Sequence, residues 1–237
     1  MTGQRPAFQH TLGLPPNIAA CLFDLDGVIT QTARVHAEAW KQTFESVLHV
    51  PFDSVKDYDR YVDGKPREEG VRSFMRAKGI TPDPTRVARI AERKDRLFLD
   101  LIHQQGVQAY PGTLRYIGEA RRRGKKLAVV SSSRHTTEVL QAAKLDRTFD
   151  AQVDGIVAER EHLDGKPAPG TYLRAATMLA TQPPDAAVYE DAIAGVEAGR
   201  AGHFGRVIGI DRVGQRDQLL QHGADIVVND LAELLEQ

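Results

Sequence analysis

The chain has 237 residues, of which 41% are hydrophobic and 27% charged, and its 31 Lys and Arg against 32 Asp and Glu leave a formal net charge of −1. This composition can bury a core and excludes a disordered or fibrous chain, and the near-neutral charge argues against a general nucleic-acid or membrane-surface binder. The single cysteine, Cys21, excludes a disulfide framework and a multi-cysteine zinc site. No apolar run approaches the roughly 20 residues that span a bilayer. Residues 1–16 lack the apolar stretch of a signal peptide, so we expect a loose lead-in there and a cytoplasmic protein.

Short, continuous apolar runs predict strands that are buried on both faces, as in a parallel sheet. In chain order these runs cover residues 18–25, 127–130, 186–189, 206–210 and 225–228. Helical patterns accompany the later runs, over residues 113–122, 136–143, 170–180, 193–201 and 216–222. Strands that alternate with helices predict an α/β fold built on a doubly wound, parallel, Rossmann-like sheet.

Residues 33–104 break this alternation because they contain no convincing strand pattern. The segment indicates helices over residues 33–48, 67–78 and 85–102, separated by breakers at Pro51, at 64–66 and at 81–84. It lies between the first two predicted strands, so we expect a helical domain inserted into the first crossover. The predicted division is an α/β core of residues 17–32 and 105–237, with residues 33–104 as the inserted domain.

Asp24 and Asp26 follow the first predicted strand two residues apart, and Gly27 comes next. In an extended chain, residues i and i+2 point to the same side, so the two carboxylates converge at the carboxyl end of the strand. Two anions that close repel each other unless a cation or a shared proton separates them. Oxygen ligands of this kind suit Mg²⁺. The alternative interpretation is a polar strand end followed by a turn.

Three further groups of polar residues follow later in the chain. Ser131, Ser132 and Ser133 offer hydroxyl and backbone N–H groups that suit an anion, or an ordinary helix cap. Lys166 precedes the stiff segment 167–169, although alone it would pass for a surface lysine. Oxygen ligands for a divalent ion, or the acidic start of a helix, are offered by the neighbouring pair Glu190 and Asp191. These three groups and the pair Asp24 and Asp26 all lie at the carboxyl ends of predicted strands. Such an arrangement is hard to obtain by chance.

The segments FDLDGVIT, VVSSS, GKPAP and EDAIAG resemble the four motifs of the haloacid dehalogenase superfamily, and the resemblance runs from residue 18 through essentially the whole chain. The helical insertion is similar to the small α-helical cap of that superfamily. More narrowly, the chain resembles the beta-phosphoglucomutase subgroup, in the first motif, in segment 93–95 and in the residues Thr32, His36, Trp40, Gly64 and Arg67.

The resemblance implies Mg²⁺-dependent phosphoryl transfer that interconverts β-glucose 1-phosphate and glucose 6-phosphate. Asp24 would be the nucleophile that forms an aspartyl-phosphate, and Asp26 the general acid and base. Mg²⁺ would be held by Asp24, the backbone carbonyl of Asp26 and Asp191, with Glu190 alongside. Implied phosphate ligands are Ser131, Ser132 and Lys166, and implied substrate contacts are Thr32, His36, Trp40, Gly64, Arg67, Lys94, Ser133, Arg134 and His135. Within the last set, Arg67 from the cap and residues 133–135 from the core would form a second phosphate pocket.

The cap motif departs from the subgroup's usual Leu-Lys-Gly-x-Ser-Arg, because Asp63 stands where the lysine is usual. Lys65, two positions later, is a candidate to compensate for that exchange, and His135 stands where asparagine is usual. Three alternatives stay open at this stage: a phosphatase acting on a small phosphorylated metabolite, a non-catalytic phosphate-binding module, and a receiver domain. A receiver domain would be about half as long and would lack an acid/base residue two positions after the phosphorylated aspartate. We expect a monomer whose partner is a small phosphorylated sugar, with neither nucleic acid nor membrane.

Overall fold

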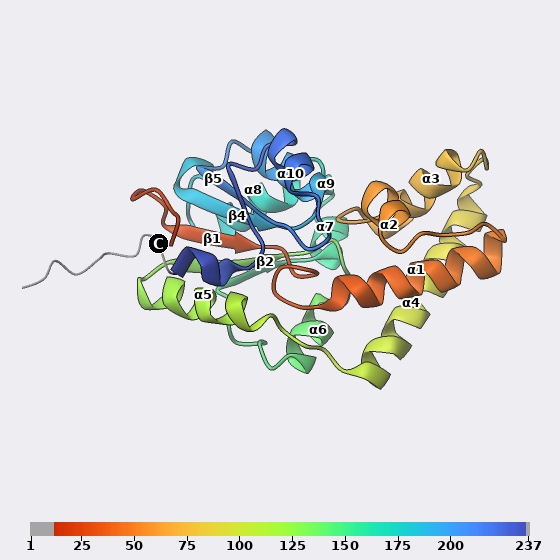
Figure 1. The fold of residues 1–237 in the computed structure, drawn as a ribbon, viewed down its shortest axis with the longest axis horizontal. Helices are drawn as coiled ribbons and strands as arrows, with labels where there is room; N and C mark the ends of the chain where they lie inside the picture. Colours follow the sequence, from red (N-terminus) through yellow and green to blue (C-terminus); the bar gives the residue numbers. More distant parts are fainter. Residues whose placement is uncertain (1–11, 236–237) are drawn as a thin grey trace, which may run out of the picture.

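A six-stranded parallel sheet forms the centre of the molecule in the computed structural model, which describes residues 12–235 (Figure 1). The spatial order is β3-β2-β1-β4-β5-β6, so β1 lies between β2 and β4. This order confirms the predicted doubly wound α/β fold. The strands are β1 (Ala20–Phe23), β2 (Lys126–Val130), β3 (Ala151–Val153), β4 (Ala186–Glu190), β5 (Arg206–Ile210) and β6 (Ile226–Val228).

Helices cover both faces of the sheet, which is why its strands are apolar throughout. In β1, Cys21 and Phe23 face one hydrophobic cluster while Ala20 and Leu22 face another, and all four are fully buried. The first face is covered by α5 (Pro111–Arg122), α6 (Thr136–Ala142) and η2 (Leu231–Leu235). On the opposite face lie α8 (Gly170–Met178), α9 (Ile193–Ala201) and α10 (Arg216–Gln221).

Four helices between β1 and β2 form a separate body at one end of the sheet (Figure 1). They have a hydrophobic cluster of their own, in which the buried rings of Phe44 and Phe74 stack with centroids 4.2 Å apart. Asp83 accepts a hydrogen bond from the backbone N–H of Arg86 and starts the longest of them, as expected of an N-cap residue. The helices are α1 (Thr32–Leu48), α2 (Lys56–Tyr61), α3 (Arg67–Ala77) and α4 (Pro84–Gln105).

Some short elements differ from the sequence-based prediction. The edge strand β3, the helix α2, the helix α7 (Gly155–Arg160) and the 3₁₀ turn η1 (Pro183–Asp185) were not expected. None of them has more than six residues, and in α2 no residue is buried, so hydrophobic periodicity carries almost no signal there.

The expected loose lead-in is wrong for the part that the structure describes. Leu12 and Leu14 are buried, and the Tyr116 hydroxyl donates a hydrogen bond to the backbone carbonyl of Leu12 at 2.7 Å. Apolar side chains therefore anchor residues 12–16 on the core, whereas residues 1–11 of the predicted lead-in lie outside the described residues. None of the helices within residues 12–235 combines the length and apolar character that a membrane crossing needs.

Candidate active site

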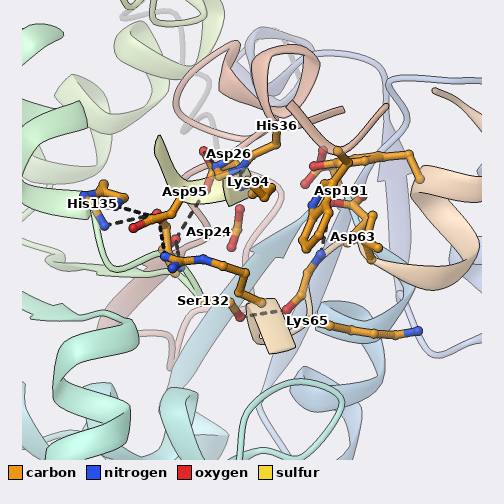
Figure 2. A pocket seen from close by; sticks show the side chains of 18 residues that line it. Asp24, Asp26, His36, Asp63, Lys65, Lys94, Asp95, Ser132, His135 and Asp191 are labelled. Atoms are coloured by element: carbon orange, nitrogen blue, oxygen red, sulfur yellow. Dashed lines mark hydrogen bonds and ion pairs between the residues drawn. The ribbon is translucent and has the colours of Figure 1, made fainter. Parts of the chain in front are cut away.

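The candidate site lies at the carboxyl ends of β1, β2 and β4, beneath the inserted helices, where an open α/β sheet places its ligands. A cavity opens there, and Figure 2 shows side chains that point into it from both parts of the chain. The core contributes Asp24, Asp26, Ser131, Ser132, Ser133, His135, Asp191 and Ala192. The insertion contributes His36, Trp40, Tyr58, Val62, Asp63, Gly64, Lys65, Arg67, Lys94 and Asp95.

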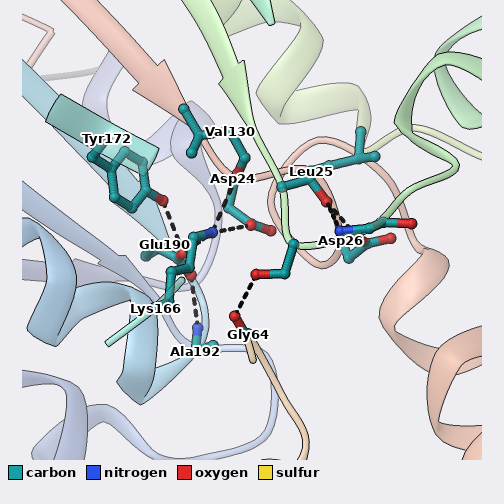
Figure 3. A network of polar contacts seen from close by, with 12 residues as sticks. Asp24, Leu25, Asp26, Gly64, Val130, Lys166, Tyr172, Glu190 and Ala192 are labelled. Carbon is teal, nitrogen blue, oxygen red and sulfur yellow. Dashed lines mark hydrogen bonds and ion pairs between the residues drawn. The ribbon is translucent and has the colours of Figure 1, made fainter. Parts of the chain in front are cut away.

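Lys166 joins two carboxylates beneath the cavity (Figure 3). Its Nζ donates to Asp24 Oδ1 at 2.5 Å and to Glu190 Oε1 at 2.6 Å, and its side chain is 1% exposed. Burial lowers the pKa of Lys166, but the two carboxylate charges outweigh that effect and raise it. The Tyr172 hydroxyl and the backbone N–H of Ala192 also donate to Glu190, so both of its oxygens have partners within the protein. The lysine therefore fixes one oxygen of Asp24 and leaves Oδ2 for an incoming group.

Asp24, Glu190 and Asp191 place one carboxylate oxygen each within 4.8 Å of the others. Asp191 is 4% exposed, and its Oδ1 has no hydrogen-bond partner among residues 12–235. Burial, together with the neighbouring carboxylates, raises the pKa of Asp24 and of Asp191, although Lys166 opposes this shift at Asp24. Three buried carboxylates against one lysine leave the cluster short of positive charge, and oxygen donors of this kind suit a divalent cation.

Gly27 makes room for the Asp191 carboxylate. Its φ of +93° lies in the left-handed region, and a Cβ built on it would lie 1.7 Å from Asp191 Oδ2. Any other residue would force the carboxylate out of the cluster. Gly27, which follows Asp24 and Asp26, thus allows the Asp191 carboxylate to approach the backbone closely. The sequence alone did not identify Asp191 as its neighbour.

Asp26 sits in a chain of polar contacts on the other side of the cavity. Its Oδ1 accepts a short hydrogen bond from the Thr32 hydroxyl and lies 3.3 Å from His36 Nε2, while Ser131 Oγ lies 3.3 Å from Oδ2. Lys94 Nζ continues the chain to His36 Nδ1 at 2.5 Å. Burial raises the pKa of Asp26, but the His36 charge, the hydrogen bonds and the Lys94 charge lower it overall to about 2. Asp26 is therefore an ionised carboxylate.

A second anion-binding arrangement lies where the insertion meets the core. Arg67 Nη2 lies 2.5 Å from Asp95 Oδ1, and His135 Nε2 from the core lies 2.8 Å from the same oxygen. The hydrogen bond to Asp95 raises the pKa of His135, while burial opposes it. A carboxylate thus sits between two side chains that can carry positive charge, which indicates the preference of this end of the cavity for anions.

The structure brings most of the predicted site residues into this cavity and moves some out of it. Thr32 lies behind Asp26, and Lys166 and Glu190 lie beneath the lining. Arg134 turns to the surface, where its guanidinium pairs with Glu159 at 2.5 Å. Arg134 also borders a neighbouring cavity together with Arg67 and Asp95, so its place at the second phosphate pocket stays a prediction.

Lys65 does not compensate for Asp63. Its backbone borders the cavity, but its Nζ donates to the carbonyl oxygens of Arg60 and Tyr61, at 3.1 and 3.4 Å, at the end of α2. The last carbonyls of a helix have no partner within the helix, so the Lys65 ammonium can bind them without reaching across the cavity. The carboxylate of Asp63 therefore faces the cavity without this lysine.

Among the six lining residues that were not predicted as site residues are Asp95 and Tyr58. Asp95 follows Lys94 on α4 and belongs to segment 93–95, which carried the resemblance, but no role was predicted for it. Tyr58 is on α2, a helix that the sequence did not predict, and its hydroxyl hydrogen-bonds to Asp63. Asp95 is contacted by residues that are far from it in sequence, and Tyr58 lies on a helix too short to be recognised from the sequence.

An α/β sheet whose strand ends carry a lysine-bound aspartate, a second aspartate and an acidic cluster, under a helical insertion, defines a phosphoryl-transfer enzyme with a cap. Comparison with known proteins agrees, since a family model described as haloacid dehalogenase-like hydrolase matches residues 18–203. A beta-phosphoglucomutase of Mycobacterium tuberculosis is 47% identical, with 95% of each chain covered, and one of Bacillus subtilis is 35% identical, with 91% of each covered. The crystal structure of a beta-phosphoglucomutase from Clostridium difficile superposes with a TM-score of 0.79 at 25% identity, covering 92% of this chain and 93% of that one. The chain belongs to the haloacid dehalogenase-like hydrolase family and is an enzyme of the beta-phosphoglucomutase-like kind.

Proposed function

We propose that the chain interconverts β-glucose 1-phosphate and glucose 6-phosphate through an aspartyl-phosphate on Asp24. The observation that supports this most is the presence of anion-binding groups at two separate ends of one cavity. Lys166 and Ser131 lie at the Asp24 end, and Arg67 and His135 lie at the other, around Asp95. A phosphatase needs one phosphate site, whereas a mutase must hold a second phosphate while the first one reacts. The second site therefore favours the mutase.

In the first half-reaction, the C6 hydroxyl of β-glucose 1-phosphate attacks the phosphorus of phosphorylated Asp24. Asp26, which is ionised before the transfer, accepts the proton of that hydroxyl. The bond between phosphorus and the Asp24 oxygen breaks, and a sugar bisphosphate forms. Thr32 and His36 act as positioning residues because they hold the reacting carboxylate of Asp26.

In the second half-reaction, the bisphosphate reorients and Asp24 attacks the phosphorus at C1. Asp26 returns its proton to the departing C1 oxygen, glucose 6-phosphate leaves, and the aspartyl-phosphate is restored. Because Lys166 holds Oδ1, Asp24 attacks through Oδ2. Ser131 and Ser132 border this end of the cavity and would donate to the transferring phosphoryl oxygens.

Mg²⁺ is the proposed cofactor, held by Asp24, Asp191 and the backbone carbonyl of Asp26. The unpartnered Oδ1 of buried Asp191 and the excess of carboxylates over lysine support this assignment. When bound, the cation would offset the repulsion between the Asp24 carboxylate and the phosphoryl group. Glu190 serves it indirectly, because its own oxygens are committed to Lys166, Tyr172 and Ala192.

The remaining contacts would select the sugar phosphate. Arg67, Ser133 and His135 would hold the phosphate that is not reacting, since a guanidinium and a protonated imidazole both suit phosphate oxygens. Trp40, Lys94 and Gly64 border the space between the two ends, where the sugar ring would lie. The Lys94 ammonium also lies 5.2 Å from the centre of the Trp40 ring, which holds both side chains against α1.

The proposal is tested by incubating the protein with β-glucose 1-phosphate, Mg²⁺ and a trace of the 1,6-bisphosphate. We expect glucose 6-phosphate to accumulate with little free phosphate. If free phosphate alone appears, the chain is a phosphatase of the same family. A third outcome, in which the sugar phosphate stays intact while it binds, would point to the non-catalytic module.

A further inference from the structure

The turn after β5, residues 211–215, lies at the same edge of the sheet as the candidate active site, because β5 pairs in parallel with β4. Asp211 fixes this turn at its start. Its Oδ1 accepts hydrogen bonds from the backbone N–H groups of residues 213–215, at 3.2, 2.7 and 2.9 Å, and its own N–H donates to the carbonyl of Val228 at 2.8 Å. These contacts hold the turn in one conformation, from which two side chains reach the acidic site.

Gln215, the last residue of the turn, supports the backbone of Asp191. Its side-chain Nε2 donates to the backbone carbonyl of Asp191 at 2.8 Å, and Gln215 is only 9% exposed. The Asp191 carboxylate has little support of its own, since its Oδ1 has no hydrogen-bond partner within residues 12–235. The place of this carboxylate therefore depends on where its backbone is held.

Arg212 supports the backbone of Gly27 in a similar way. Its Nε donates to the backbone carbonyl of Gly27 at 2.7 Å, and its Nη1 donates to the carbonyl of Asn229 at 2.9 Å. The guanidinium also lies over the ring of Tyr110, with Cζ 3.6 Å from the ring centre, and the side chain is 15% exposed. Two hydrogen bonds and one stacking contact thus fix the direction of Arg212.

Gly27 and Asp191 are the two residues whose close approach lets the Asp191 carboxylate lie beside Asp24. A Cβ on Gly27 would lie 1.7 Å from Asp191 Oδ2, so a small shift of either backbone changes this fit. One five-residue turn therefore holds both sides of the contact, through two carbonyl groups.

We propose that Arg212 and Gln215 are positioning residues of the acidic site, which set the place of the Asp191 carboxylate through the backbones of Gly27 and Asp191. Their role rests on the proposed function, since Asp191 is one of the proposed ligands of Mg²⁺. Neither side chain touches the reacting atoms in this scheme. Each acts by holding one of the two turns that meet beside Asp24.

The charge of Arg212 predicts the opposite effect, which makes the two explanations separable. Burial raises the pKa of Asp191, whereas the Arg212 charge lowers it, so Arg212 is a positive neighbour of that carboxylate. A positive charge close to a cation site weakens binding of the cation. If charge alone mattered, Arg212→Met would bind Mg²⁺ more tightly than the wild type, whereas loss of position weakens binding.

Calorimetric titration with MgCl₂ in the absence of substrate tests the proposal. Gln215→Met and Arg212→Met remove the two donors, and we expect Mg²⁺ to bind about 10–100-fold more weakly, the usual effect of losing an outer partner of a metal site. Arg212→Lys keeps the charge without the planar guanidinium and should show a similar loss. Gln218→Met and Arg216→Met are matched controls, because both residues are exposed on α10, and they should bind Mg²⁺ as the wild type does.

Amide hydrogen exchange, measured without Mg²⁺, tests the local step. The N–H of Gly27 donates to the carbonyl of Thr30 at 2.7 Å, and the N–H of Ala192 donates to Glu190 Oε2 at 3.2 Å. Arg212→Met should exchange faster at Gly27, and Gln215→Met should exchange faster at Ala192. Wild-type protection in β2 shows that each variant is folded. If a methionine variant loses this protection as well, the smaller changes Arg212→Lys and Gln215→Asn take its place.

Three results would overturn the inference: wild-type Mg²⁺ affinity in the folded variants, tighter binding by Arg212→Met, or unchanged exchange at both amides. A wild type that does not bind Mg²⁺ would overturn it too. If the wild type produces glucose 6-phosphate while the variants bind Mg²⁺ unchanged, only the positioning roles fail. If the wild type releases free phosphate alone while the variants lose Mg²⁺ affinity, the mutase proposal fails and the positioning roles stand.

Discussion

Replacing Lys166 by methionine should destabilise the fold itself, beyond any loss of activity. The ammonium lies 2.5 Å from Asp24 and 2.6 Å from Glu190, and the three side chains are at most 9% exposed. Methionine fills similar space but leaves two buried carboxylates without their common cation. Removing one partner of a buried ion pair typically costs about 3–5 kcal/mol. For a chain of this size that loss corresponds to a fall of roughly 6–20 °C in Tm, at ~2–4 °C for each kcal/mol.

Urea unfolding, followed by circular dichroism with and without MgCl₂, measures this effect. Lys41→Met, on the exposed face of α1, is the control and should stay within about 0.5 kcal/mol of the wild type. MgCl₂ should stabilise Lys166→Met more than the wild type, because the proposed cation site adjoins Asp24 and Glu190, which have lost their positive partner. The double variant Lys166→Met with Glu190→Gln should recover part of the loss. A loss below about 1 kcal/mol in Lys166→Met would refute the reasoning that the lysine compensates buried charge.

Four further predictions concern the reaction and the second anion site. Asp24→Asn should form no covalent phospho-enzyme while keeping its fold, because Glu190 still pairs with Lys166; a labelled phospho-enzyme in this variant would show another nucleophile. Asp26→Asn should slow formation of glucose 6-phosphate about 10²–10⁴-fold, the usual contribution of general acid–base catalysis. His135→Asn should lose stability in a pH-dependent way, since contact with Asp95 raises the folded-state pKa of His135 above 6.5. The stability it contributes is fully present below the unfolded pKa and is lost as pH rises through the folded pKa, so the urea midpoints of variant and wild type should converge at higher pH; a constant gap would contradict this. Arg67→Ala should reduce isomerisation far more than hydrolysis of acetyl phosphate, which has one phosphate, and equal losses would make Arg67 a structural residue.

The sheet and the acidic strand ends could be predicted from the sequence because their signals are local. The apolar run before Asp24 and the run before Glu190 each become a strand buried on both faces, β1 and β4, and parallel pairing of these neighbours brings their carboxyl ends together. The polar residues after each strand must then meet at one edge of the sheet. This logic needs only the order of the strands and the position of each motif.

Side-chain direction could not be predicted in the same way. Lys65 is adjacent to the cavity in sequence, but its ammonium donates to the backbone carbonyls of Arg60 and Tyr61. Arg134 follows the serine motif, yet Glu159, on a helix that the sequence did not indicate, takes its guanidinium to the surface. Both outcomes depend on partners that exist only once α2 and α7 have formed.

The two carboxylates that the cap brings to the cavity, Asp63 and Asp95, have opposite surroundings. One end of the cavity is therefore richer in positive charge and the other richer in negative charge. Asp95 lies between Arg67 and His135, so this end already binds one anion and presents the donors that a substrate phosphate would use. Asp63 lies among carboxylates, so its end carries more negative than positive charge. A substrate with one phosphate could engage either end but not both. A bisphosphate, held at one end by the donors around Asp95 and at the other by the proposed cation and Lys166, would satisfy both charge patterns at once and would hold the cap closed during transfer.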